Sequence, residues 1–270
     1  MDRRYDIDWI RVIVLGILIF YHAWASFMPF AKSIFMPQNE DFLIPMGIPM
    51  SLINIWRIPI LFMISGMGIF FAMQSRNWKQ MVNDRIKRIF VPMFFGFLFI
   101  GPLTAFFGML FYDEELAWYP SLFHLWFLLN IWVYFCVLLP LFVYLQNRPN
   151  NFLFTKLQSI ISSRFGIYIF ALPFLIEALV IDPQDYPSYA TTLHGWVLGL
   201  ICFTCGFIFV SLKDYFWNAL EKIKNFTLVV AFSFYIYRLL TMELWAPSIF
   251  IAFESFNWMI AILGYSAKYL

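Results

Sequence analysis

Three ionisable side chains near the N-terminus repeat on one face of an apolar segment. Asp8, Arg11 and His22 lie in the run Asp8-Trp-Ile-Arg11-Val-Ile-Val-Leu-Gly-Ile-Leu-Ile-Phe-Tyr-His22. In a helix, Arg11 and His22 fall roughly 20° apart around the axis and about 16 Å apart along it. Asp8 and Arg11 form an i, i+3 pair in which the carboxylate neutralises the guanidinium. Ionisable side chains within an apolar segment are costly, so this polar stripe is a candidate functional site. The structural alternative is that Arg11 extends to the interface and His22 bonds a neighbouring helix.

A second group of cations lies at Arg85 and Arg88, preceded by Arg76 and Lys79. Two arginines three positions apart share one side of a helix. A guanidinium fork holds phosphate better than a point charge does, so the pair suits the phosphates of a nucleotide-containing donor. The alternatives are an ordinary positive loop or a contact with anionic lipid.

A third group of polar residues stands near the opposite ends of the apolar segments. It comprises Asn54, Trp56, Arg57, His124, Glu177 and His194. Tryptophan and asparagine beside charged groups would suit a carbohydrate, so we expect these residues to line an acceptor pocket. The histidines are not spaced as paired ligands within one helix, and we expect no metal site.

The elements that carry these residues are too apolar for a soluble domain. The 270 residues are 62% hydrophobic, 22% aromatic and 13% charged, whereas soluble domains have about 25% charged residues. A membrane-spanning helix needs about 20 apolar residues. Eight stretches qualify, and they are approximately 11–30, 50–73, 89–111, 122–145, 165–181, 195–212, 225–242 and 246–265. We therefore predict an all-α polytopic transmembrane bundle forming a single domain, 1–270.

The distribution of charge predicts the orientation of the bundle. Lysine and arginine gather at both chain ends and at 76–88, 148–164 and 213–224, whereas the alternate loops hold mainly acidic residues. Positive loops face the cytoplasm, so both termini are predicted inside. The net charge of +2 makes nucleic acid an unsuitable partner, and membrane lipids the expected surroundings. A cleaved signal peptide is the alternative for the N-terminus.

Two shorter patterns bear on packing. The stretch 213–224 mixes charges and aromatic residues at helical spacing and is expected to form a short interfacial helix. Ser65-Gly66 follows an apolar run, which favours close helix packing over a nucleophile.

Four motifs, taken in order, resemble the membrane-bound acyltransferase-3 family and look closest to its glucan-succinylating and O-acetylating branch. They are Arg4-Tyr-Asp-Ile-Asp8-Trp-Ile-Arg11 followed by His22, Trp56-Arg57-Ile-Pro-Ile-Leu-Phe-Met-Ile-Ser65-Gly66, Arg85-Ile-Lys-Arg88, and His124-Leu-Trp126-Phe-Leu. Together these motifs cover roughly the first half of the chain.

The resemblance implies transfer of an acetyl or succinyl group from cytoplasmic acyl-coenzyme A to a hydroxyl of an extracytoplasmic carbohydrate or glycolipid, in a bacterial cytoplasmic (inner) membrane. By position, His22 corresponds to the family's catalytic histidine and Arg11 to its arginine partner. Arg85 and Arg88 correspond to the arginines associated with coenzyme A, which is a donor substrate and not a tightly bound cofactor.

Two departures from the family pattern leave other functions open. The family usually has about ten spans, so the chain looks truncated at its C-terminus. Asn130 and Ile131 stand where other branches place an acidic residue. The alternatives are an inactive truncated member, or a transporter or flippase that moves an anionic or acylated substrate along the same polar stripe.

Overall fold

The computed structural model describes residues 4–34, 36–148, 151–241 and 246–270, and within these ranges it contains helices and no strand. The α-helices are α1 (Tyr5–Ala25), α2 (Gly47–Asn54), α3 (Arg57–Met73), α4 (Trp78–Arg85), α5 (Val91–Phe95), α6 (Gly101–Phe111), α7 (Trp126–Gln146), α8 (Phe152–Ser162), α9 (Ala171–Ile181), α10 (Leu193–Ser211), α11 (Asp214–Thr241) and α12 (Ser248–Tyr269). The 3₁₀ turns are Lys32–Ile34, Ile44–Met46, Phe123–Leu125 and Gly166–Phe170, and the π turns are Ile86–Phe90 and Gly96–Ile100.

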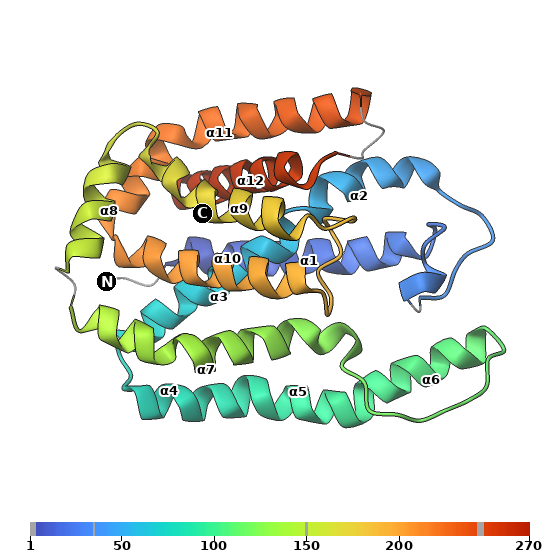
Figure 1. Cartoon of the computed structure of the whole chain (residues 1–270). Coiled ribbons are helices and arrows are strands. Elements are labelled where there is room, and N and C mark those ends of the chain that lie inside the picture. The colour runs from blue at the N-terminus through green and yellow to red at the C-terminus, as the bar shows by residue number, and fades with distance from the viewer. Residues whose placement is uncertain (1–3, 35, 149–150, 242–245) are drawn as a thin grey trace.

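The long helices run side by side and confirm the predicted all-α polytopic bundle (Figure 1). Seven helical runs among the described residues are long and apolar enough to cross a membrane. Three of these runs, Ile44–Met73, Trp78–Phe111 and Phe123–Gln146, are made of more than one successive element. The predicted segment 165–181 corresponds to the shorter apolar run Gly166–Ile181.

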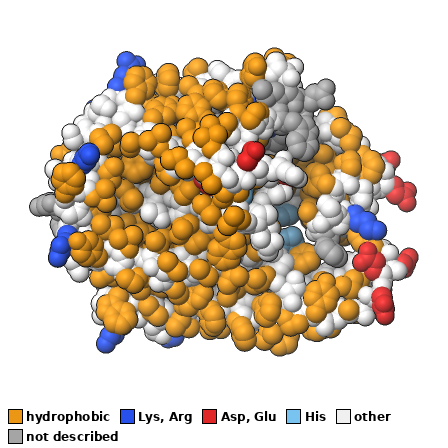
Figure 2. Space-filling view, viewed as in Figure 1, with side chains coloured by type: hydrophobic (Ala, Val, Ile, Leu, Met, Phe, Trp, Pro, Cys, Tyr) orange, Lys and Arg blue, Asp and Glu red, His pale blue; other side chains and the backbone are white. Residues whose placement is uncertain are grey.

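Charge is divided between the two ends of the bundle. Figure 2 shows lysine and arginine side chains mainly at one end and acidic side chains mainly at the other, with a wide apolar surface between the two ends. The first described residue, Arg4, begins next to α1 at the cationic end, and the C-terminus also lies toward that end in Figure 1. Large exposed apolar side chains, such as Ile19, Phe107 and Val229, are the kind that lipid covers. This distribution supports the predicted orientation.

Helix α3 lies at the centre and packs most extensively against α10. Their backbones touch at two glycines, because a Cβ on Gly66 would overlap the Phe203 carbonyl and a Cβ on Gly206 would overlap the Met63 carbonyl. Small residues allow such close approach in membrane helices, where the hydrophobic effect contributes little to helix association. The close packing predicted at Ser65-Gly66 is therefore confirmed.

We expect Gly206→Ala to destabilise the protein by about 1–3 kcal/mol, since the added methyl group overlaps backbone that cannot move alone. Gly16→Ala in α1 is the matched control, because a Cβ there meets no atom within 4 Å. Thermal unfolding in detergent checks both variants. An unchanged melting temperature for Gly206→Ala would contradict the described α3–α10 contact.

Two π turns widen the run from α4 to α6, and each comes immediately before a proline-containing helix start. The backbone N–H of Val91 donates to the Ile86 carbonyl, and that of Gly101 donates to the Gly96 carbonyl. A wider turn moves a carbonyl away from the following proline ring, which would clash in a regular helix. Arg88 lies in the first π turn, and Arg85 immediately precedes it.

Residues 213–224 do not form a separate interfacial helix, contrary to the prediction. From Asp214 onward they continue without a break into α11, because Phe216, Leu220 and Ile223 are buried on one face of the helix. Helix α8, which crosses the cationic end of the bundle, was not among the predicted segments (Figure 1). The Asn151 side chain caps α8 by accepting from the Phe154 N–H at 2.8 Å.

Candidate active site

His22 lies in the last turn of α1, toward the acidic end of the bundle, and is partly exposed. Its Nδ1 lies 3.0 Å from the Leu18 carbonyl oxygen. Because a carbonyl oxygen only accepts hydrogen bonds, this contact places the proton on Nδ1 of the neutral ring. The lone pair is then on Nε2, which is the arrangement that a general base needs.

The fold brings His124 to His22. His124 lies in the short 3₁₀ turn that precedes α7, and the centroids of the two imidazole rings are 5.1 Å apart. Figure 2 shows histidine side chains in a hollow of the surface, toward the acidic end of the molecule. The two histidines therefore form one site, although His124 was predicted only as part of a separate acceptor pocket.

Arg11 occupies the same helix nearer its N-terminus. Its Nη1 lies 3.7 Å from Asp8 Oδ1, which agrees with the predicted i, i+3 pair. A Cβ on Gly68 would lie 3.6 Å from Arg11 Nη2, so the guanidinium packs against α3. Between Arg11 and His22, Leu15 on the same face of α1 remains 44% exposed. Leu18, which is also on this face, is partly buried and packs against the core, so the face is exposed at Leu15 but not along its whole length.

Further arginines gather around Arg11 at the cationic end. The charges of Arg11, Arg76 and Arg88 are close enough to act on Arg85. Arg85 is half-buried, with its Cζ 5.8 Å from the Phe135 ring, whereas Arg88 is exposed. Arg76 is partly neutralised by Asp84 at 3.2 Å. We call Arg11, Arg76, Arg85 and Arg88 the arginine cluster, and such a cluster attracts a polyanion.

Arg57 begins α3 near the histidines and is only 6% exposed. Its Cζ lies 3.3 Å from the centre of the Tyr21 ring, and its charge is close enough to act on His22. Nη2 donates to Asn54 Oδ1 at 3.0 Å, whereas Nε and Nη1 have no hydrogen-bond partner among the described residues. Neighbouring Trp56 faces an apolar groove of about 240 Å³ between α1 and α12.

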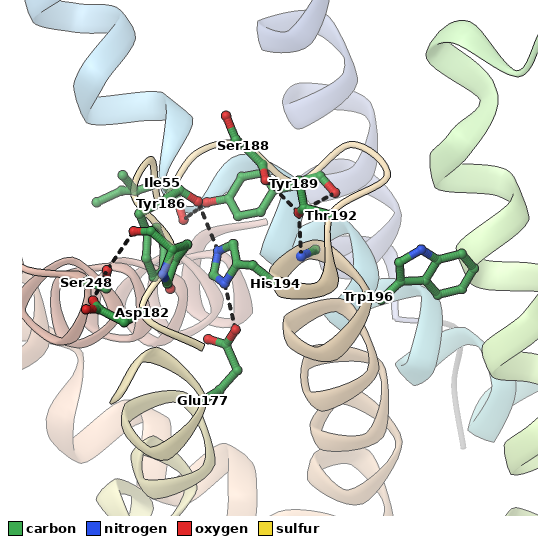
Figure 3. A network of polar contacts seen from close by, with 12 residues as sticks. Ile55, Glu177, Asp182, Tyr186, Ser188, Tyr189, Thr192, His194, Trp196 and Ser248 are labelled. Atoms are coloured by element: carbon green, nitrogen blue, oxygen red, sulfur yellow. Dashed lines mark hydrogen bonds and ion pairs between the residues drawn. The ribbon is translucent and has the colours of Figure 1, made fainter. Parts of the chain in front are cut away.

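Glu177 and His194 do not line an open pocket with the other predicted acceptor residues. Both are buried, and Glu177 Oε1 lies 2.6 Å from His194 Nδ1. His194 Nε2 donates to the Tyr186 carbonyl at 3.0 Å. Figure 3 shows His194 between the Glu177 carboxylate and the loop that carries Tyr186 and Tyr189. The pair therefore holds this loop against α9 and α10.

The same loop supports the break between α2 and α3. The Ile55 carbonyl accepts from Tyr189 Oη at 3.0 Å and from Ser255 Oγ at 2.8 Å. Burial raises the pKa of Tyr189 well above its usual value, so the hydroxyl keeps the proton that it donates. One turn earlier, the Ser51 carbonyl accepts from Arg238 Nη2 at 3.2 Å. These contacts satisfy carbonyls that a broken helix leaves exposed, and they fix the residues just before Arg57.

Arg238 also forms a buried ion pair that the sequence analysis did not select. Its Nε lies 2.9 Å from Glu254 Oε2, and the Glu254 side chain is fully buried. Both residues stand in predicted spans, so the rule that marked Arg11 and His22, an ionisable group within the membrane, would also have found this pair.

Arg238→Met should destabilise the protein by about 3–5 kcal/mol, because it leaves the Glu254 carboxylate buried without its cation. Replacing both partners, as Arg238→Met with Glu254→Leu, should recover most of that loss. Unfolding in detergent measures both variants. If Arg238→Met alone is as stable as wild type, the Arg238–Glu254 ion pair does not stabilise the fold.

The fold and the site define a class: a helical membrane protein with two neighbouring histidines toward one end of α1 and a cluster of arginines at the other. The comparisons agree with this class. A family model for the acyltransferase domain of the acyltransferase-3 type matches residues 4–267, and this chain belongs to that family. Neither the curated proteins nor the solved structures contain a significant match. The protein is therefore an integral-membrane acyltransferase, and the family match favours this class over a transporter.

Proposed function

We propose that this acyltransferase moves an acetyl or succinyl group from cytoplasmic acyl-coenzyme A to a hydroxyl of an extracytoplasmic carbohydrate or glycolipid, in a bacterial cytoplasmic membrane. The observation that carries the proposal is the arrangement along α1. Arg11 lies within the arginine cluster at one end, and His22 lies beside His124 at the other. Helix α1 thus extends from the arginine cluster, which would bind the phosphates of the donor, to His22, which would act as the base.

The donor requires a site for several phosphates and a path for a long, narrow arm. The arginine cluster offers guanidinium groups that bind phosphate with two parallel hydrogen bonds. Half-buried Arg85 would hold a phosphate more strongly than exposed Arg88, because water screens it less. The uncovered face of α1 at Leu15 is where the acyl-bearing arm would extend toward His22.

The acceptor hydroxyl has a high pKa and needs a base to attack a thioester. His22 Nε2 takes the hydroxyl proton as the oxygen bonds to the thioester carbonyl carbon. The carbon–sulfur bond then breaks, and the coenzyme A thiolate receives that proton from His22. The products are an ester and a free thiol, and Nδ1 stays bonded to the Leu18 carbonyl throughout, which holds the ring orientation.

The acceptor would enter from the acidic end, where the hollow beside His22 is open. His124 is the second polar group there, within reach of a hydroxyl bound near His22. We infer a sugar as the acceptor because Tyr21, Arg57 and His124, which are aromatic or polar, lie around His22. Membership of the glucan-succinylating branch is part of the same proposal.

Release of coenzyme A thiol tests this function. Purified protein in detergent is incubated with radiolabelled acetyl- or succinyl-coenzyme A and soluble glucans or glycolipids. The proposal predicts thiol release that depends on the acceptor, with the label recovered in an alkali-labile ester. Absence of thiol release with every donor and acceptor would contradict it and would favour an inactive member of the family.

A further inference from the structure

The most unusual charged group beside the histidines is Arg57. A buried guanidinium is stable only when its N–H groups are satisfied, because desolvation of a charge costs several kcal/mol. Only 6% of the Arg57 surface is exposed. Its Nε and Nη1 nevertheless have no hydrogen-bond partner among the described residues. Nη2 donates to the neutral amide oxygen of Asn54, and the Tyr21 hydroxyl also lies close enough to the guanidinium to interact with it. Within the described ranges no carboxylate pairs with Arg57, so the site offers positive charge and free donors.

The backbone adds to this positive charge. Arg57 is the first residue of α3, a helix of 17 residues, and its N-cap residue Trp56 makes no side-chain cap. The start of a helix carries a partial positive charge and unpaired N–H groups, which favour an anion. The helix start and the unpartnered guanidinium are independent features that point to the same ligand chemistry.

The position of Arg57 is fixed before any ligand binds. Tyr21 covers one face of the guanidinium at 3.3 Å, and Asn54 holds Nη2. Tyr189 donates to the Ile55 carbonyl, two residues before Arg57, and Figure 3 shows this tyrosine beside Ile55. Ser255 donates to the same carbonyl. Donors that are held in place in a site of low dielectric stabilise developing charge without reorganising during the reaction.

We propose that Arg57 is a catalytic residue whose unpartnered N–H groups bind the oxyanion formed when the acceptor hydroxyl attacks the thioester. This inference rests on the proposed function. When the acceptor oxygen bonds to the carbonyl carbon, the carbonyl π electrons move to oxygen, and Arg57 donates to that oxygen. The electrons return as the carbon–sulfur bond breaks, and the thiolate leaves with the proton that His22 took. Arg57 itself gains and loses no proton.

The test compares Arg57→Gln, Arg57→Lys and wild type in acyl transfer from acetyl-coenzyme A to the best soluble acceptor. Loss of an oxyanion donor should lower kcat about 10²–10³-fold. The KM and the directly measured Kd for the donor should stay within about threefold of wild type, because the oxyanion exists only in the transition state. Arg57→Lys should recover part of the loss, since it keeps the charge without the fork.

Arg148→Gln is the matched control. Arg148 also lies over a tyrosine ring, with its Cζ 4.8 Å from the centre of the Tyr144 ring. It follows the C-terminal end of α7, whereas His124 precedes the N-terminal end of that helix. The control variant should keep wild-type kcat. Addition of guanidinium ion to Arg57→Ala provides a second test, and it should raise kcat at least tenfold while leaving Arg148→Gln unchanged. If Arg57→Gln retains kcat, or loses donor binding as much as turnover, Arg57 is not an oxyanion donor. If wild type shows no transfer at all, the proposed function fails first.

Discussion

His22→Ala should lower acyl transfer by about 10²–10⁴-fold, the range that a positioned general base contributes. The reason is the hydrogen bond from Nδ1 to the Leu18 carbonyl, which leaves Nε2 to take the proton of the acceptor. Among the described residues, the Leu18 carbonyl is the hydrogen-bond partner of His22, and a carbonyl cannot take the proton in place of Nε2. Initial rates of thiol release, normalised to folded protein, measure the effect.

Two controls separate loss of the base from loss of structure. His124→Gln removes the neighbouring ring 5.1 Å away and should reduce the rate less than His22→Ala does. Both variants should bind acyl-coenzyme A with wild-type affinity, because the arginine cluster lies at the other end of α1. Full activity of His22→Ala would exclude His22 as the base.

The second large effect is expected on the donor. Replacing both Arg85 and Arg88 with alanine should weaken acyl-coenzyme A binding by about 10²-fold or more, since hydrogen bonds to charged groups are each worth about 1.5–3 kcal/mol. Arg85→Ala alone should account for most of the loss, because Arg85 is half-buried and Arg88 is exposed. Isothermal titration with acetyl- and succinyl-coenzyme A measures the two affinities.

The matched control for charge is the double variant Lys79→Ala and Lys87→Ala, which removes the same number of cations from the same run of the chain. Both lysines are exposed, so water and salt screen them, and their loss should weaken binding by less than about fivefold. Equal losses for the arginine and lysine variants would show only general attraction of an anion, without a defined phosphate site.

The spans were predictable from sequence because a membrane requires length and apolarity, and these are local properties. The seven spanning runs and the shorter run at 166–181 follow the predicted segments. Helix α8 was missed, since an amphipathic helix that does not cross the membrane lacks that signal. The extension of α11 to Asp214 was missed because the charged residues of 213–224 lower the mean hydropathy there. The apolar face formed by Phe216 and Leu220 was therefore not recognised as part of a long helix.

Local pairs at the site were also predictable, whereas long-range contacts were not. The Asp8–Arg11 pair follows from helical spacing and is present at 3.7 Å. The approach of His124 to His22 depends on how α7 packs beside α1, and no spacing within one helix encodes it. The break in the helix at Ile55 could not be predicted from the apolar run around it. The hydroxyl groups that bond to the Ile55 carbonyl belong to Tyr189 and Ser255, which are distant in the sequence.

The most direct test of the account is transfer across a sealed membrane. The protein is reconstituted into vesicles and the population with the arginine cluster facing inward is selected. Radiolabelled acetyl-coenzyme A is enclosed inside, and a soluble glucan is added outside. The account predicts labelled ester on the external glucan and free coenzyme A thiol inside, with neither formed by His22→Ala. External label that is still attached to coenzyme A, or label that appears outside without internal thiol, would contradict acyl transfer along α1.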